Sequence, residues 1–118
     1  MKVAVVDEWL HKGEPTLGGT CLNVGCIPSK ALLESSHLYA AAKNDLSGHG
    51  INIKQVGLDV KAMIARKDKI VRELTQGISG LFKTNKIKLV HGLARVSPGR
   101  IVDVSDRGSP NTRESLEA

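Results

Sequence analysis

The chain has 118 residues, which allows one domain with a modest core. Hydrophobic residues make up 41% and charged residues 25%, ordinary for a globular protein, and the formal net charge is +5. Aromatic residues are only 3%, so stacking on nucleic-acid bases has little to use. No apolar run approaches the roughly 18 residues of a membrane span. We therefore expect no nucleic-acid partner and no membrane partner.

The first half of the chain predicts a strand, a loop and a helix. The run KVAVVDEW, at 2–9, is continuously apolar and β-branched before its acidic end, typical of a strand buried on both faces. Glycine and proline at 10–20 predict a loop. A helix is expected from Pro28, because proline suits a first helical turn, and NDLSGHG at 44–50 ends it.

The second half predicts a long helix and a β-meander. A short strand INI is expected at 51–53. Asp59 can cap a helix whose apolar stripe runs over 60–84, and the two helices are expected to lie antiparallel. The run KIKLVHGLARV predicts a strand at 86–96, SPGR at 97–100 a turn, and IVDVSD at 101–106 the return strand of a hairpin. A second turn, RGSPN at 107–111, and a further segment at 112–118 follow.

Both cysteines of the chain fall within a few residues of the expected helix start. On one regular helix Cys21 and Cys26 would lie too far apart for a disulfide, so a closed pair requires Cys21 in an irregular turn and Cys26 near the helix entry. Asn23 and Gly25 between them tolerate unusual backbone angles. The residues alone leave three interpretations open: a redox pair, half of a zinc site, or two unrelated reduced cysteines.

The surrounding string resembles a known signature. GGTCLNVGCIPSKALL, at 18–33, is similar to the redox-active motif of the flavin-dependent pyridine nucleotide-disulfide oxidoreductases, and its tail favours the branch that acts on dihydrolipoamide. The strand at 2–9 is similar to the second strand of the family's FAD-binding Rossmann unit, and the long helix with the strand after it also resembles the family. The resemblance extends from Lys2 to about Val104.

The resemblance implies catalytic roles for three residues. Cys21 matches the thiol that exchanges disulfides with the substrate. Cys26 matches the thiol that lies against the flavin ring, and the positive end of the helix favours its thiolate. Lys30 matches a lysine near the reactive flavin nitrogen, where a cation stabilises a reduced anionic flavin.

The resemblance also implies cofactor contacts. Asp7 falls where the family's acidic residue bonds the adenosine ribose. The loop along the phosphate and ribityl portion of FAD corresponds to Gly18, Gly19 and Thr20, where glycines allow close backbone approach. No metal ligand set is expected.

The implied fold class is α/β: residues 1–118 form a partial FAD-binding Rossmann-like domain with two long antiparallel helices and a β-hairpin or meander. We find no first strand with G-x-G-x-x-G, no NAD domain and no dimerisation domain, and so expect a segment of a longer enzyme. That enzyme would be a homodimer in a bacterial cytoplasm or a mitochondrial matrix. It would oxidise dihydrolipoamide with FAD and NAD, serving a 2-oxoacid dehydrogenase complex or the glycine cleavage system. Two alternatives are a glutathione-type or mercuric-type reductase, and a small non-catalytic interaction module.

Overall fold

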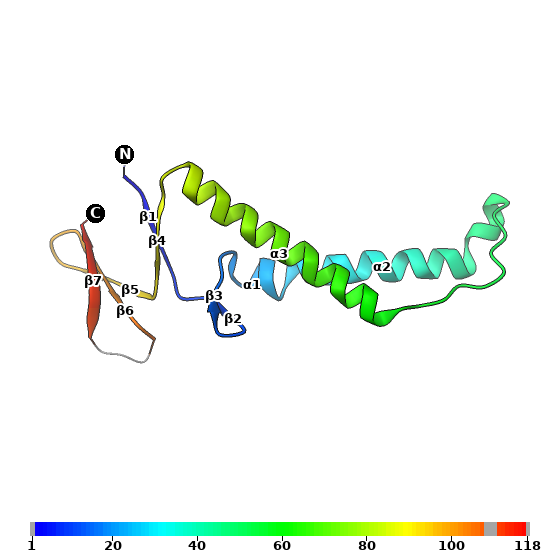
Figure 1. The fold of residues 1–118 in the computed structure, drawn as a ribbon, viewed down its shortest axis with the longest axis horizontal. Coiled ribbons are helices and arrows are strands. Elements are labelled where there is room, and N and C mark those ends of the chain that lie inside the picture. Colours follow the sequence, from blue (N-terminus) through cyan, green and yellow to red (C-terminus); the bar gives the residue numbers. More distant parts are fainter. Residues whose placement is uncertain (1, 108–110, 118) are drawn as a thin grey trace. The chain divides into compact units, whose positions relative to one another are not determined.

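A computed structural model describes residues 2–107 and 111–117, and Figure 1 shows the order of their helices and strands. The chain divides into two parts. The strand unit comprises residues 1–19 and 75–118, and the helix-hairpin unit comprises residues 20–74. The mixed helix-and-strand class with two long helices and a meander is confirmed.

The strand unit contains a parallel pair. Strand β1 (Ala4–Asp7) pairs with β4 (Lys88–His91), with Ala4 opposite Lys88 and Asp7 opposite His91. The strand expected at 2–9 is therefore present but shorter. Because the chain must cross over to form a parallel pair, the helices lie between these strands in the sequence.

The loop expected at 10–20 contains a small hairpin, so this prediction is wrong in part. Strand β2 (Leu10–His11) pairs antiparallel with β3 (Glu14–Pro15). The two residues between them are Lys12 and Gly13, with φ of 54° and 86°. Positive φ at both central residues is what a tight two-residue hairpin turn requires, and the sequence shows no Asn-Gly or Asp-Gly pair that would have announced it.

The single strand expected at 86–96 is two strands that belong to different sheets. After β4 the chain turns at Gly92, whose φ is 150°, and then enters β5 (Leu93–Ser97). Strands β5, β6 (Ile101–Ser105) and β7 (Thr112–Glu117) form an antiparallel three-stranded meander, which confirms the hairpin and extends it. The turn between β5 and β6 is 98–100, and the second expected turn falls partly outside the described residues.

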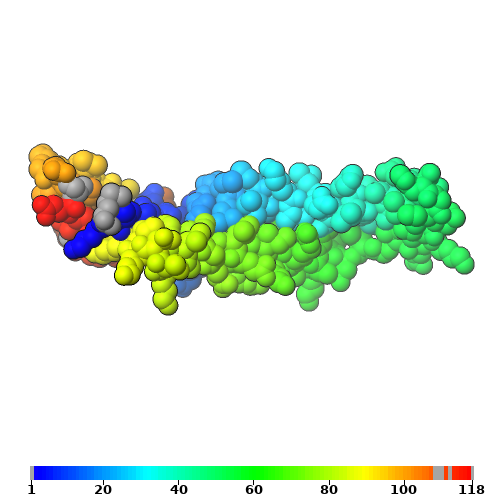
Figure 2. All heavy atoms as spheres, turned by 90° about the horizontal axis from the view of Figure 1, so that it is seen from above, coloured from blue at the N-terminus to red at the C-terminus, as the bar shows by residue number. Residues whose placement is uncertain are grey.

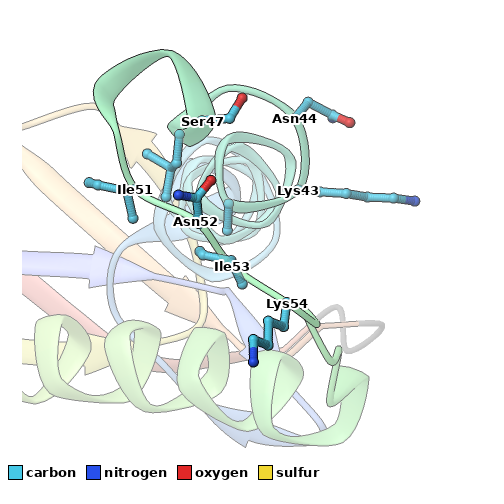
Figure 3. Close-up of a pocket in the computed structure, with 9 residues that line it drawn as sticks. Lys43, Asn44, Ser47, Ile51, Asn52, Ile53 and Lys54 are labelled. Carbon is cyan, nitrogen blue, oxygen red and sulfur yellow. The ribbon is translucent and has the colours of Figure 1, made fainter.

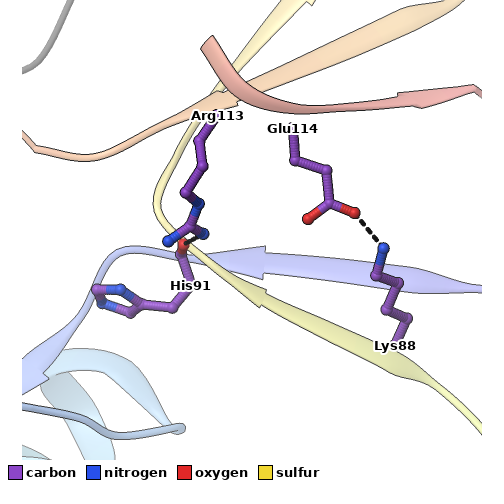
Figure 4. Close-up of polar contacts among 4 residues, drawn as sticks. All are labelled: Lys88, His91, Arg113 and Glu114. Atoms are coloured by element: carbon purple, nitrogen blue, oxygen red, sulfur yellow. Dashed lines mark hydrogen bonds and ion pairs between the residues drawn. The ribbon is translucent and has the colours of Figure 1, made fainter. Parts of the chain in front are cut away.

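Two polar contacts connect the parallel pair to the meander within the strand unit (Figure 4). The Lys88 ammonium of β4 pairs with the Glu114 carboxylate of β7. At the other end of β4, the backbone carbonyl of His91 accepts a hydrogen bond from the Arg113 guanidinium of β7. These contacts supplement the covalent connection through Gly92 between the two sheets.

The helix-hairpin unit begins with the short helix α1 (Gly19–Asn23), followed by α2 (Cys26–Asn44) and the 3-10 turn η1 (Leu46–His49). Residues 51–59 are irregular, so the strand expected at 51–53 is wrong. Its two isoleucines are both exposed, and no neighbouring strand pairs with them.

The long helix is confirmed as α3 (Val60–Thr84), which starts in the helix-hairpin unit and ends in the strand unit. Asp59 caps it, because its Oδ1 accepts from the Ala62 N–H at 2.9 Å. Within the helix-hairpin unit, α2 and the first half of α3 run side by side in opposite directions, as expected (Figures 1 and 2). None of the helices in the described part of the chain is long and apolar enough to cross a bilayer.

Candidate redox site

The two cysteines are placed by two helices that meet end to end. Cys21 lies in the middle of α1, and Cys26 is the first residue of α2. The irregular turn at Cys21 was expected for a closed disulfide; with both cysteines free, the irregular backbone is at Gly25, whose φ and ψ are −109° and −108°. The predicted position of Cys26 at the helix entry is confirmed. Both cysteines are exposed and free.

Gly25 connects the two helices through hydrogen bonds in both directions. The Thr20 carbonyl at the start of α1 accepts from Val24 N–H at 3.0 Å and from Gly25 N–H at 2.7 Å. The Gly25 carbonyl in turn accepts from Ser29 N–H at 3.1 Å, the first backbone bond of α2. One residue therefore closes α1 and opens α2.

In this arrangement the Cys26 side chain influences the ionisation of the Cys21 thiol. A hydrogen bond with the Cys26 side chain is the main reason why the pKa of the Cys21 thiol is raised. The Lys30 ammonium acts in the opposite direction and lowers it. Lys30 follows Cys26 by four residues, so both side chains lie on one face of α2. Cys21, Cys26 and Lys30 thus form one cluster.

The N-terminal half of α2 is held by contacts behind this cluster. Pro28 and Ala31 are its buried residues. The Ala31 carbonyl also accepts from the Arg66 guanidinium of α3 at 3.2 Å, a hydrogen bond across the helix hairpin. Because these contacts restrain the first turns of α2, they also restrain the backbone from which Cys26 and Lys30 extend.

Of the other predicted cofactor residues, three lie in the strand unit (Asp7, Gly18 and Gly19), and Thr20 lies in the helix-hairpin unit. Asp7 ends β1, opposite His91, and its Oδ1 accepts from the Trp9 N–H at 2.9 Å. Gly18 and Gly19 have φ of 105° and 56°, a backbone that side chains disfavour, and they lead directly into α1. Thr20 is the second residue of α1 and is exposed.

The hollows of the helix-hairpin unit lie away from these residues. A cavity of about 160 Å³ opens at the tip of the hairpin, and residues of the end of α2, η1 and the following loop line it (Figure 3). Lys43 and Asn44 point away from it into solvent. An open apolar groove of about 420 Å³ lies between α2, the 56–58 segment and α3. None of the predicted site residues lines either hollow.

No set of three or more histidine, cysteine, aspartate or glutamate side chains is placed to hold a metal ion within 2–107 and 111–117.

The sequence indicates only that Gly25 tolerates unusual backbone angles. The structure also shows that Gly25 lies in close contact with the backbone of α1. A Cβ on Gly25 would lie 3.0 Å from the Thr20 carbonyl oxygen and 3.2 Å from the Cys21 Cα. A glycine placed directly before the second cysteine is the available signal, but the contact itself depends on how α1 folds.

The α/β elements and the cysteine cluster agree with the family that the sequence resembles. Residues 1–109 match the family model described as pyridine nucleotide-disulphide oxidoreductase, and the chain belongs to this family.

Curated relatives give the more particular resemblance. The chain is 56% identical over 96 residues to the leghemoglobin reductase of Vigna unguiculata, which covers 80% of the chain and 18% of the relative. It is 49% identical over 116 residues to the mitochondrial dihydrolipoyl dehydrogenase of Dictyostelium discoideum, a match that covers 98% of the chain and 23% of the relative. It is 52% identical over 84 residues to the dihydrolipoyl dehydrogenase of Cupriavidus necator, a match that covers 71% of the chain and 18% of the relative. The chain therefore spans about a fifth of the length of these relatives.

Proposed function

We propose that this chain carries the dithiol–disulfide centre of a dihydrolipoyl dehydrogenase, and that residues 1–118 are part of its FAD-binding domain. The full-length enzyme would oxidise dihydrolipoamide and reduce NAD. The observation that carries the proposal is the placement of two free cysteines at the junction of α1 and α2, Cys21 in α1 and Cys26 at the start of α2. Relatives named dihydrolipoyl dehydrogenase support the choice of substrate.

The cysteines perform the exchange with substrate. In the oxidised state Cys21 and Cys26 share a disulfide. One substrate thiolate attacks the Cys21 sulfur, which breaks that bond, forms a mixed disulfide and releases Cys26 as a thiolate. The second substrate thiol then attacks the substrate sulfur of the mixed disulfide. The substrate leaves as a cyclic disulfide, and its two electrons and two protons reside on the cysteine pair or on nearby groups.

The order of attack follows from where the two residues lie. Cys26 is the first residue of α2, and it matches the family's thiol that lies against the flavin. The pKa of Cys21 is raised mainly by its hydrogen bond with Cys26, so Cys21 is the sulfur that keeps a proton when one is shared. We therefore assign substrate exchange to Cys21 and the flavin-facing thiolate to Cys26.

The chain offers groups that suit FAD. FAD, when bound, supplies a two-electron acceptor that regenerates the cysteine disulfide and passes the electrons to NAD. Asp7 would hold the ribose hydroxyls, since it ends one strand of a parallel pair. The backbone at Gly18, Gly19 and Thr20 would lie along the cofactor, because a Cβ on Gly19 would meet nothing within 4 Å and the backbone there is open. Lys30 would hold a positive charge beside the reactive part of the flavin.

Partners and compartment follow from the proposed activity. The substrate would be the lipoyl group of a 2-oxoacid dehydrogenase complex or of the glycine cleavage system, and the enzyme would act as a homodimer. Relatives described as mitochondrial and a bacterial relative are both similar to the chain. We propose a bacterial cytoplasm first and a mitochondrial matrix second.

Variants of the two cysteines in the full-length gene product test this function. Cys26→Ser should abolish the long-wavelength absorbance that a thiolate gives beside an oxidised flavin after two-electron reduction. Cys21→Ser should keep a thiolate beside the flavin yet lose nearly all NAD-linked oxidation of dihydrolipoamide. Ser36→Ala, an exposed position on the same helix, is the control and should behave as the unchanged protein.

The substrate assignment has its own contradicting result. Turnover with glutathione disulfide or mercuric ion, and none with dihydrolipoamide, would move the chain to a glutathione-type or mercuric-type reductase. Absence of bound flavin in the full-length product would instead favour an interaction module without catalysis.

A further inference from the structure

We propose that Gly25 is the positioning residue that sets the separation of the two sulfurs and thereby the stability of their disulfide. The inference rests on the proposed function of the cysteine pair. It concerns a residue that acts through the backbone of Thr20 and Cys21.

Gly25 contacts the start of α1 through backbone atoms only. The Gly25 N–H reaches the Thr20 carbonyl at 2.7 Å, which is short for an N–H···O bond and holds Gly25 tightly against the first turn of α1. A Cβ at this position would lie 3.0 Å from the Thr20 oxygen and 3.2 Å from the Cys21 Cα. Neither atom can swing away as the end of a side chain does, so an added methyl group must displace the α1 backbone, and Cys21 with it.

Such a displacement affects the oxidised pair more than the reduced pair. A disulfide fixes the Cβ–Cβ separation within about 3.5–4.5 Å and stores strain outside that range. Two thiols accept a longer separation, because a hydrogen bond to sulfur tolerates more variation than a covalent S–S bond. A few tenths of an ångström of extra separation therefore favours the dithiol.

The restriction is local to Gly25 within the helix-hairpin unit. A Cβ on Gly48 or Gly57 would meet nothing within 4 Å, and neither glycine has a positive φ. Gly48→Ala is therefore a matched control that adds the same methyl group in open space.

The experiment measures the equilibrium of the pair in the full-length gene product. The flavin-loaded protein is equilibrated with buffers of fixed ratios of oxidised and reduced dithiothreitol. In this exchange two cysteine thiols become one disulfide while the cyclic disulfide of dithiothreitol becomes a dithiol. Rapid alkylation followed by peptide mass spectrometry then gives the fraction of protein in which Cys21 and Cys26 are both protected.

We expect Gly25→Ala to lower the equilibrium constant for disulfide formation about tenfold, equivalent to about 30 mV for a two-electron couple. Gly48→Ala should leave the constant unchanged. If Gly25→Ala does not fold, the pair Thr20→Gly and Thr20→Gly/Gly25→Ala replaces it, because a glycine at position 20 lets the α1 backbone yield. The double variant should then show the lower constant relative to Thr20→Gly alone.

The outcomes separate the inference from the function on which it rests. Equal constants for Gly25→Ala and the unchanged protein overturn the role of Gly25 and leave the proposed redox centre standing. Cysteines that remain alkylated in the unchanged protein at every buffer ratio overturn the redox centre itself. A lower equilibrium constant for disulfide formation in Gly25→Ala, with an unchanged constant in Gly48→Ala, supports the inference.

Discussion

Asp103 is the acceptor at the centre of a polar cluster on the β-meander. Its two carboxylate oxygens accept from Ser97 Oγ of β5 and Ser115 Oγ of β7, each at 2.6 Å. Donors on both sides favour the ionised form, so the Ser115 and Ser97 hydroxyls lower the pKa of the Asp103 carboxyl. One residue on the middle strand thus holds both outer strands.

Replacement of Asp103 should loosen the meander in a pH-dependent way. The lowered pKa means that the contribution is present above the ordinary carboxyl value of about 3.9 and is lost as the pH falls through the folded-state pKa. We expect Asp103→Asn to speed amide hydrogen exchange in β5 and β7 at pH 7 relative to the unchanged full-length protein. The difference, corrected for intrinsic exchange, should shrink as the carboxyl of the unchanged protein is protonated. A difference that stays constant down to acidic pH would contradict this account.

The raised pKa of the Cys21 thiol leads to a second prediction about a single residue. The thiolate reacts with alkylating agents, so a raised pKa moves the alkylation profile of Cys21 to higher pH. Cys26→Ala removes the hydrogen bond that raises the pKa, and the profile should shift to lower pH, with faster alkylation at neutral pH. Lys30→Gln removes the charge that lowers the pKa and should shift the profile upward. Stopped alkylation with mass spectrometry on the reduced protein measures both, and shifts in the same direction would contradict the assignment.

At the scale of elements, Gly92 separates the parallel pair from the meander. Its φ is 150°, and a Cβ there would lie 2.7 Å from both the Ser105 carbonyl oxygen and Val104 Cγ1. Val104 is fully buried, so its side chain has nowhere to move. Glycine is required at this junction for both its backbone angle and its lack of a side chain.

We therefore expect Gly92→Ala to destabilise the strand unit by about 2 kcal/mol. Gly99→Ala is a useful comparison, because its φ of 80° is also positive, but the nearest atom to an added Cβ would be Ile101 Cδ1, 4.0 Å away. Denaturant unfolding of the full-length variants measures the loss. Equal losses at the two positions would show that backbone angle alone, rather than the clash, sets the effect.

The sequence predicted elements well where one local signal was sufficient. The α3 helix was predicted with its bounds, because a regular apolar stripe and the Asp59 cap specify it. The sequence predicts one strand at 86–96 where the structure has two, β4 and β5. Apolar residues continue across Gly92, and only tertiary contacts show that the chain changes sheet there. The hairpin at 10–15 depends on positive φ at Lys12, which no residue preference announces.

The candidate site followed the same rule. The cysteines and Lys30 were identified because their motif is contiguous, and the structure brings these three together. The helical state of Cys21 and the contact of Gly25 with Thr20 were not predicted, because both depend on how two short segments pack against each other.

For the whole molecule, apolar surface is the dominant feature. The buried hydrophobic residues in the described parts of the chain are few: Leu17, Ala31, Val71, Val90 and Val104. Large apolar side chains on both long helices remain exposed, among them Leu33 at 66% and Leu81 at 62%. The parallel pair has only two strands, whereas parallel sheets are ordinarily covered on both faces.

Residues 1–118 expressed alone should therefore bind the dye ANS strongly and self-associate on gel filtration. The physical reason is that so small a core offsets little of the entropy lost on folding. The full-length gene product is the control and should bind much less dye per molecule. A cooperative unfolding transition without dye binding in the 118-residue chain would contradict the prediction.

The pairing of β1 with β4 has a consequence for how the polypeptide is made. Ala4 meets Lys88, so β1 leaves the ribosome long before its partner β4 exists. At roughly 5–20 residues per second, the delay is on the order of ten seconds. During that interval β1 lacks β4 beside it, while the local helices can already form. Nascent chains of this protein should therefore depend on a chaperone that shelters β1 until translation has passed the long helix.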